Sequence, residues 1–121
     1  MPLIIDSHIH TWGTSFPNRP FPWTPDPFDS EHLLEVLDAN GVAHCVDITP
    51  IMYQWDNEYG LDAVAKHPSR IRVFGRFDPF ANDAEGRLSR WMLNSGAAGV
   101  RLTFYGNDLQ KLDNAEDLEP F

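Results

Sequence analysis

Two histidines two positions apart are the strongest chemical feature of the sequence. His8 and His10 end an apolar run that begins at Leu3, and side chains two apart on a strand leave the same face of a sheet. Two such imidazoles can bind one divalent metal ion, so both residues are candidate catalytic residues and candidate metal ligands. Asp6 shares their face one layer deeper and could orient a ligand. The alternative is a pair of ordinary strand-end histidines that make hydrogen bonds.

A catalytic metal site needs at least a third protein ligand, and the other histidines are badly placed to supply it. His32 falls on a predicted helix, His44 near the start of a predicted strand and His67 at a helix end. We interpret all three as structural or surface residues. Asp47 and Asp78 lie near the ends of predicted strands and could each supply a carboxylate, although Asp78 precedes a proline, which is equally typical of a turn.

Arg101 is a candidate substrate-binding residue. It lies in a short predicted strand beside Gly99, and an inward-facing arginine there would be buried and would need an anion. The carboxylate of a substrate would satisfy it through two parallel hydrogen bonds. An internal salt bridge and an outward-facing side chain are the alternatives.

The segment from Thr11 to Asp29 is rich in proline and aromatic residues and includes Trp12. Proline makes such a segment stiff and largely non-helical. We expect it to form one wall of a pocket, with Tyr53 of a later loop extending the aromatic rim. Trp12, Tyr53 and Asp78 are therefore further candidates for substrate binding. The segment could instead pack on a neighbouring subunit or form a small hydrophobic cluster.

The elements that must position these residues alternate between strand and helix. Strands are predicted at Leu3–His10, Val42–Ile48, Ile71–Phe77 and Gly99–Leu102. The first helix opens at Ser30, with Leu33, Leu34, Val36 and Leu37 on one face, and closes at Asn40-Gly41. A second is capped by Asp56 or Asn57 and stops at His67-Pro68, and a third begins at a capping box of Asn82 and Glu85. Its apolar face carries Leu88, Trp91 and Met92.

This alternation favours parallel strands with covering helices. The loops from helix to strand are short, whereas the loops from strand to helix are long and aromatic. Ligands of parallel α/β proteins bind at the carboxyl ends of the strands, where the long loops lie. The sequence therefore places its specialised residues on one side of the molecule.

Composition excludes several classes of function. The chain has 121 residues and a net charge of −9, which argues against nucleic acid and against anionic membranes as partners. It contains no apolar run near the ~18 residues of a transmembrane helix, and we expect no signal peptide from the short apolar run at its start. Its one cysteine, Cys45, cannot form an internal disulfide, and we expect a buried packing residue in a cytoplasmic protein. Phosphate-binding and Gly-x-Ser-x-Gly motifs are also absent.

Four stretches together resemble the amidohydrolase-related family of TIM-barrel hydrolases, in its lactonase and decarboxylase branch. They are Ile5-Asp6-Ser7-His8-Ile9-His10-Thr11-Trp12, the stretch from Asp56-Asn57-Glu58-Tyr59 to Ala63, Arg72-Val73-Phe74-Gly75 with Asp78-Pro79, and Gly96-Ala97-Ala98-Gly99-Val100-Arg101-Leu102. The likeness runs in order along nearly the whole chain. The proline-rich first loop is most similar to lactonases that act on pyrone dicarboxylates and related lactones.

The resemblance implies that His8 and His10 line the active site and that Arg101 grips a substrate carboxylate. It also implies a divalent metal such as zinc or manganese, although several members of the branch work without one. A (β/α)8 barrel takes about 250 residues, so we expect residues 1–121 to form the N-terminal half of such a barrel domain. The run from Asp113 to Phe121 resembles the approach to a fourth helix. The chain alone is then expected to be inactive, with the catalytic base beyond Phe121.

The predicted function of the complete protein is hydrolysis of a carboxylate-bearing lactone or a similar cyclic ester of an organic acid. Non-oxidative decarboxylation on the same fold is the alternative within the family. The stretch from Asp6 to Thr11 is also similar to the start of the polymerase-and-histidinol-phosphatase family of metal phosphoesterases. A third alternative is a non-catalytic half-barrel, whose exposed sheet edges would favour pairing with a second copy or a partner.

Overall fold

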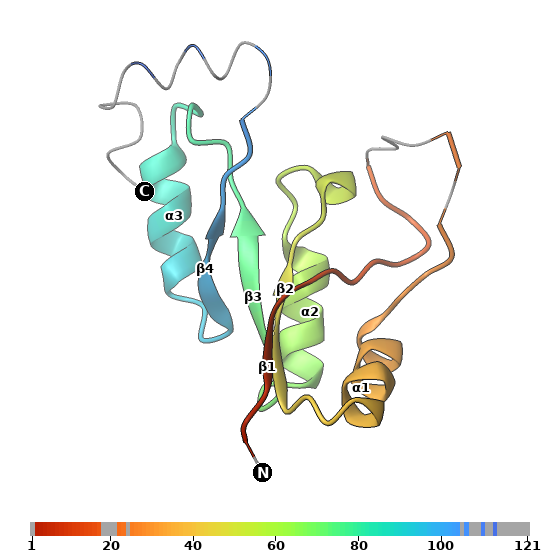
Figure 1. Ribbon diagram of the computed structural model, residues 1–121. Coiled ribbons are helices and arrows are strands. Elements are labelled where there is room, and N and C mark those ends of the chain that lie inside the picture. Colours follow the sequence, from red (N-terminus) through yellow and green to blue (C-terminus); the bar gives the residue numbers. More distant parts are fainter. Residues whose placement is uncertain are drawn as a thin grey trace.

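The computed structural model describes residues 2–17, 22–23, 25–104, 106, 110 and 113. Along the chain the elements are β1 (Ile5–Ile9), α1 (Ser30–Ala39), β2 (His44–Ile48), the short 3-10 helix η1 (Ile51–Tyr53), α2 (Glu58–Lys66), β3 (Ile71–Arg76), α3 (Ala84–Met92) and β4 (Ala97–Arg101). The strands form one parallel sheet in the order β1-β2-β3-β4 (Figure 1). The predicted alternation of strand and helix is confirmed.

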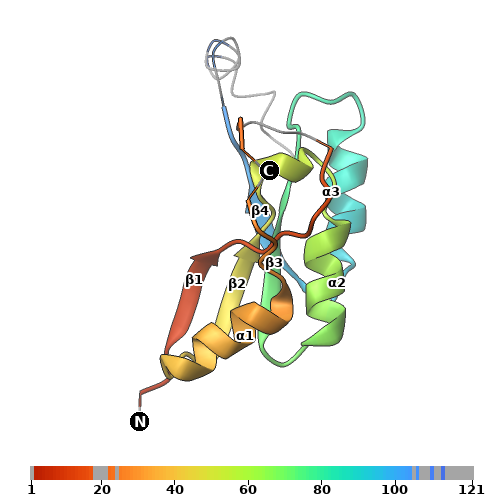
Figure 2. The same ribbon diagram turned by 90° about the vertical axis from the view of Figure 1, so that its right-hand side faces the viewer.

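All three helices lie on the same side of the sheet (Figure 2). We call this side the outer face, and it holds the hydrophobic core. Leu33 of α1, Cys45 of β2, Val64 of α2, Val73 of β3 and Trp91 of α3 are all buried there. Cys45 is thus a packing residue, as predicted. Within the described part of the chain, no helix is long and apolar enough to cross a membrane.

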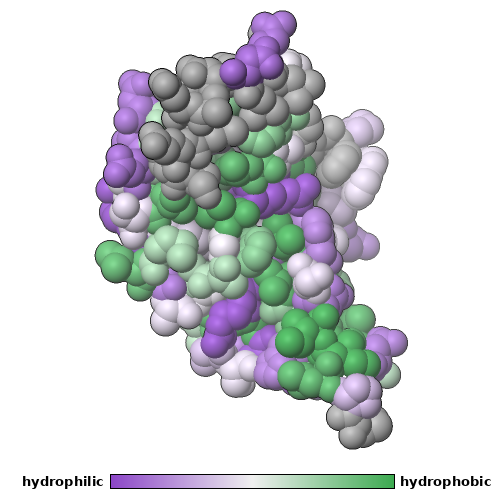
Figure 3. Space-filling view, turned by 60° about the vertical axis from the view of Figure 1, so that its left-hand side comes forward, coloured by the Kyte–Doolittle hydropathy of each residue, from purple (hydrophilic) through white to green (hydrophobic). Residues whose placement is uncertain are grey.

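The opposite side of the sheet, which the helices leave uncovered, is the inner face. On β3 it carries Arg72, Phe74 and Arg76, because side chains alternate along a strand and Ile71 and Val73 point into the core. Figure 3 shows part of this side, where hydrophilic and apolar side chains are intermixed and apolar surface extends toward the N-terminal end.

The first helix begins and ends as its sequence predicts. Asp29 accepts a hydrogen bond from the backbone N–H of His32 at 3.0 Å, which satisfies a free donor of the first turn. At the other end Gly41 has a φ of 69°, a left-handed conformation that favours glycine. Val36 was expected on the buried face but is 46% exposed, because the helix buries a narrower stripe.

Two further details of the helices differ from expectation. The predicted capping box of Asn82 and Glu85 is wrong, because α3 begins at Ala84 and Asp83 is its N-cap without a side-chain capping bond. Asp83 instead pairs with Arg87 one turn later, at 2.8 Å. Met92 was expected on the apolar face and is 58% exposed. The expected fourth helix after Asp113 lies outside the described residues.

Candidate active site

The two histidines of β1 lie side by side on the inner face. Their ring centroids are 5.1 Å apart, with the rings nearly perpendicular at 85°. Ile9, between them, packs against the core on the outer face, which fixes the opposite direction for its neighbours. The expectation that Asp6 shares the face of the histidines is wrong, because a register shift between Asp6 and Ile9 leaves Asp6 paired with Cys45, on the outer side of the sheet. Its carboxylate accepts a hydrogen bond from the backbone N–H of His8 at 3.0 Å.

A neighbouring strand sets the orientation of His10. Its Nδ1 lies 2.6 Å from the carbonyl oxygen of Ile48 at the end of β2. Because a carbonyl oxygen can only accept, Nδ1–H donates, and the Nε2 lone pair of the neutral ring is left for a ligand. Burial lowers the pKa of His10; the bond to Ile48 raises it, and the charges of His8, Arg101 and Arg76 lower it further. The site therefore favours a neutral imidazole at this position.

His8 and His10 could supply two of the ligands of a divalent metal ion, but the ligand set is incomplete. Among the residues that the structure describes, no group of three or more His, Cys, Asp or Glu side chains could hold an ion. A catalytic zinc site has three protein ligands. The other histidines lie elsewhere, as predicted: His32 pairs with Asp29, and His44 lies 2.9 Å from the carbonyl oxygen of Ser69.

A β-bulge turns Arg101 toward the inner face. Val73 pairs with Ala97, but the next residue, Phe74, pairs with Gly99, so β4 contains one additional residue at this point. A side chain on Gly99 would lie 2.9 Å from the Phe74 ring, which leaves only glycine comfortable there. Beyond the bulge, Arg101 pairs with Arg76 across the ladder. Without the additional residue, Arg101 would share the side of Ala97 and face the helices.

A cavity of about 270 Å³ brings the inner-face residues together. His10, Arg76 and Arg101 supply its polar groups, whereas Trp12, Trp23 and Met52 are among its apolar residues. None of the ion pairs formed among the described residues involves Arg101. Arg101 thus faces the cavity and is partly buried, and its grip on a substrate carboxylate stays a prediction.

The first loop reaches this cavity because its two ends are tied together. Trp12 and Phe28 exchange two backbone hydrogen bonds of 2.9 Å, and their rings pack at 5.6 Å. The Trp12 indole N–H also donates to the carbonyl of Asp26 at 2.7 Å. Trp12 is thus held beside His10 as part of the cavity wall. Residues 18–21 and 24 of the loop lie outside the described residues.

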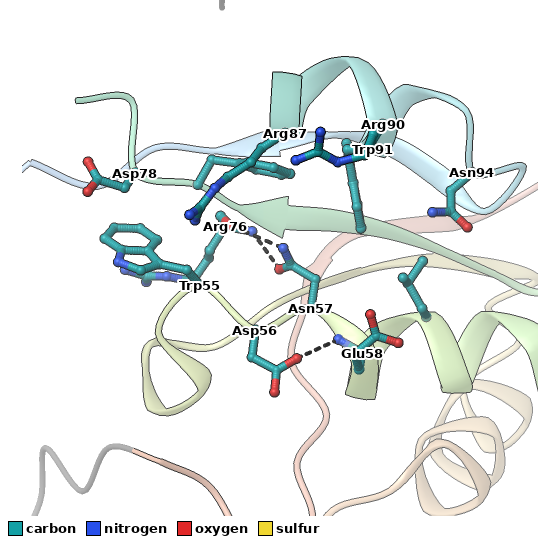
Figure 4. A pocket seen from close by; sticks show the side chains of 12 residues that line it. Trp55, Asp56, Asn57, Glu58, Arg76, Asp78, Arg87, Arg90, Trp91 and Asn94 are labelled. Atoms are coloured by element: carbon teal, nitrogen blue, oxygen red, sulfur yellow. Dashed lines mark hydrogen bonds between the residues drawn. The ribbon is translucent and has the colours of Figure 1, made fainter. Parts of the chain in front are cut away.

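Tyr53 and Asp78 lie away from the cavity of His10. Tyr53 is 5% exposed, its hydroxyl accepts a hydrogen bond from the Gly13 N–H at 2.9 Å, and its ring stacks on Tyr59. Asp78 accepts from the Phe80 N–H at 3.0 Å, an Asx turn of the kind its sequence allows. Asp78 lines a second pocket, between α2 and α3, where Figure 4 shows it near Trp55. Their roles in substrate binding remain predictions.

Asp47 has a different role from the carboxylate ligand considered for it. It is 1% exposed and points to the outer face, as Cys45 two residues earlier does. Its carboxylate accepts from the Thr11 N–H at 3.0 Å and from the Thr11 hydroxyl at 2.5 Å. Burial raises the pKa of Asp47 to about 6, against the lowering effect of both Thr11 bonds. Asp47 therefore fastens the residue that follows His10.

Arg76 is a cavity residue that the sequence reasoning missed. It ends β3 in the way that Arg101 ends β4, two residues after Phe74 on the same face. The signal that could have found Arg76 is its position at the carboxyl end of a predicted parallel strand, on the face opposite the core residues, because ligands bind at that end.

The chain matches no family model and no curated protein. It does resemble solved structures. A putative 2-pyrone-4,6-dicarboxylic acid hydrolase from Pseudomonas putida superimposes with a TM-score of 0.73 at 27% identity, covering 98% of this chain and 43% of that one. A probable enzyme of the same name from Acinetobacter baumannii, with citric acid bound, gives 0.71 at 21% identity, covering 96% and 45%. An amidohydrolase from Burkholderia multivorans with bound zinc gives 0.70 at 18%, covering 97% and 43%.

These likenesses identify the fold as half of an amidohydrolase-type (β/α)8 barrel. The chain spans less than half the length of the structures that it matches. Two of these neighbours carry the name 2-pyrone-4,6-dicarboxylic acid hydrolase and one the name amidohydrolase, and the likeness to them shows the fold of this chain.

Proposed function

We propose that this chain contributes to a hydrolase that opens a lactone, or a similar cyclic ester, of a carboxylate-bearing organic acid. The observation that carries the proposal is the cavity at the carboxyl ends of the strands, in which His10 and Arg101 lie beside an aromatic wall. The names of two structural neighbours, both 2-pyrone-4,6-dicarboxylic acid hydrolases, are consistent with such a substrate. Residues 1–121 would then supply one half of the barrel domain.

The residues divide the work between binding and positioning. Arg101 holds the carboxylate of the substrate through its planar pair of donors. Trp12 packs against the ring and keeps bulk water away from it. His10, fixed through Nδ1, accepts a hydrogen bond at Nε2 from the water that attacks the ester carbonyl. The water oxygen bonds to the carbonyl carbon, the ring C–O bond breaks, and the released oxygen takes up the proton that the water loses.

A divalent metal would bind His8 and His10, as zinc is present in one structural neighbour, and on His10 it would take the Nε2 lone pair in place of the hydrogen bond from the water. When bound, such an ion polarises a carbonyl or lowers the pKa of a water. The described residues do not complete its ligand set, and none of the steps above depends on it.

The test is an assay of the complete barrel protein that contains residues 1–121 on 2-pyrone-4,6-dicarboxylate, with ring opening followed by loss of ultraviolet absorbance. Arg101→Met should raise KM roughly 10- to 100-fold, because a hydrogen bond to a charged group is lost. Arg90→Met, on the exposed surface of α3, is the matched control and should leave KM unchanged. Release of carbon dioxide instead of a ring-opened acid would contradict the proposal in favour of a decarboxylase, and equal KM values for Arg101→Met and Arg90→Met would remove Arg101 from substrate binding.

A further inference from the structure

Arg76 lies beside Arg101 because of the register of the sheet. The two residues are direct partners in the ladder between β3 and β4, and both line the cavity that contains His10. Neighbouring strands of a sheet are about 4.8 Å apart, so two guanidinium-bearing side chains leave the same face from adjacent backbones. Like charges placed directly opposite each other destabilise a sheet. An anion between the two side chains would reverse this effect.

The loop between β2 and α2 holds Arg76 in place from several directions. The Asn57 side chain accepts from the Arg76 backbone N–H at 2.8 Å and donates to its carbonyl at 3.1 Å, as Figure 4 shows. The Arg76 Nε–H donates to the Gln54 carbonyl at 3.2 Å, and its guanidinium lies 5.4 Å from the centre of the Trp55 ring. The arginine is 3% exposed and lies between the cavity of His10 and the pocket of Trp55 and Asp78, both of which it lines. Its direction is therefore set before any ligand arrives.

Gln54 adopts an unusual backbone conformation to make one of these contacts. Its φ is 54°, a left-handed value that costs a non-glycine residue about 1 kcal/mol or more. The conformation turns the Gln54 carbonyl toward Arg76. Strain of this kind persists where surrounding contacts impose it, and it is concentrated at binding sites.

We propose that Arg76 is a second substrate-binding arginine, and that Arg76 and Arg101 together hold one carboxylate of the substrate between them. The inference rests on the proposed function, because it specifies how that site recognises its organic acid. In place of a two-bond grip by Arg101 alone, each guanidinium donates to one carboxylate oxygen, which places the anion at the β3–β4 side of the cavity. The remainder of the substrate then extends toward His10 and the aromatic wall.

Binding of isophthalate (benzene-1,3-dicarboxylate) tests the proposal apart from catalysis, because this planar diacid has no ester to hydrolyse. Titration calorimetry on the protein should show Arg76→Met weakening the affinity at least about tenfold, since a charged hydrogen bond is lost. Arg72→Met is the matched control, because Arg72 lies on the same face of β3 but bonds the Pro68 carbonyl away from the cavity. It should change the affinity less than about twofold.

Two further variants keep the test decisive if Arg76→Met does not fold. Arg76→Lys retains the charge and loses the planar fork, so it should bind isophthalate more weakly with unchanged circular dichroism. In the Arg76→Lys/Arg101→Met double variant, the losses of affinity should not multiply, because both side chains hold the same carboxylate.

Unchanged affinity in a folded Arg76 variant, or losses that multiply in the double variant, would overturn the shared site. Such a result would leave the proposed hydrolysis intact, since that is measured separately on the lactone. Conversely, tight Arg76-dependent binding of isophthalate, together with no ring opening of the lactone in the separate assay, would support the shared site and count against the hydrolase.

Discussion

The two faces of one sheet use charged residues in opposite ways. On the outer face, Asp47 is 1% exposed and its carboxylate is occupied by two donors of Thr11. On the inner face, Arg76 is 3% exposed but lines a cavity together with His10 and Arg101. Both charges are buried, so burial alone does not distinguish a structural residue from one that can bind a ligand. The face of the strand, and what covers that face, makes the distinction.

This difference has a physical basis in the helices. A side chain on the outer face is enclosed by α1, α2 or α3, and a polar group there must find a partner within the protein. A side chain on the inner face points to the side that the helices leave uncovered. Its partner can be a ligand. The difference between the faces makes predictions for residues on either one, and the largest effects are expected where the helices enclose a side chain completely.

The largest effect is expected from Asp47→Asn, measured by urea unfolding between pH 4 and pH 7. Because the pKa of Asp47 is raised from 3.8 to about 6, the folded state binds more protons than the unfolded state between these values. The free energy of unfolding therefore falls as pH rises from about 4 to 6, by a contribution on the order of 3 kcal/mol. The variant should lose this fall. Its amide can still accept from the Thr11 N–H and donate to the Thr11 hydroxyl oxygen.

Thr11→Val provides the companion measurement for the same contact between Thr11 and Asp47. It retains the hydrogen bond from the Thr11 backbone N–H to Asp47 and removes the Thr11 hydroxyl. Because that hydroxyl lowers the pKa of Asp47, its removal should raise this pKa further. The fall in the free energy of unfolding should then extend to higher pH, whereas Asp47→Asn should abolish it. If wild type and Asp47→Asn show the same pH dependence, Asp47 is not a buried outer-face carboxylate with a raised pKa.

A matched pair of valines tests how unequally the two faces contribute to the core. Val73 on the outer face of β3 is 0% exposed, whereas Val46 on the inner face of β2 is only partly buried. Val73→Ala should lower the free energy of unfolding by about 2 kcal/mol, through lost burial and the cavity that remains. Val46→Ala should lower it by less than about 1 kcal/mol. Equal losses in chemical denaturation would show that the inner face is packed as tightly as the outer one.

Much of this arrangement can be predicted from sequence, since strands and helices alternate with clear local signals. The spacing of His8 and His10 predicts that their rings share a face, and the structure confirms it at 5.1 Å. The Asn40-Gly41 ending of α1 is predicted equally well, because a left-handed residue after a helix requires glycine. Such features depend on residues close together in the chain.

Features that depend on pairing between strands could not be predicted in this way. The direction of Arg101 depends on a bulge opposite the step from Val73 to Phe74. Gly99 is a local sign of irregularity in β4, but it does not determine which side Arg101 faces. Arg76 has no motif of its own, and its role emerges only from its partner across the ladder. Asp47 resembles a site carboxylate in sequence, but its donors come from Thr11, which is 36 positions away.

The smallest effect concerns Tyr53, which sequence reasoning assigns to substrate binding and which the structure buries against Gly13 and Tyr59. Tyr53→Phe removes the hydroxyl that accepts the Gly13 N–H and should lower the free energy of unfolding by about 1 kcal/mol. Tyr59→Phe, the control from the same stack, should lower it less, because no described residue hydrogen-bonds its hydroxyl. If Tyr53 belongs with the structural residues, both variants should bind isophthalate with wild-type affinity in calorimetry. Weaker binding by Tyr53→Phe alone would instead make this residue a link between the first loop and the substrate.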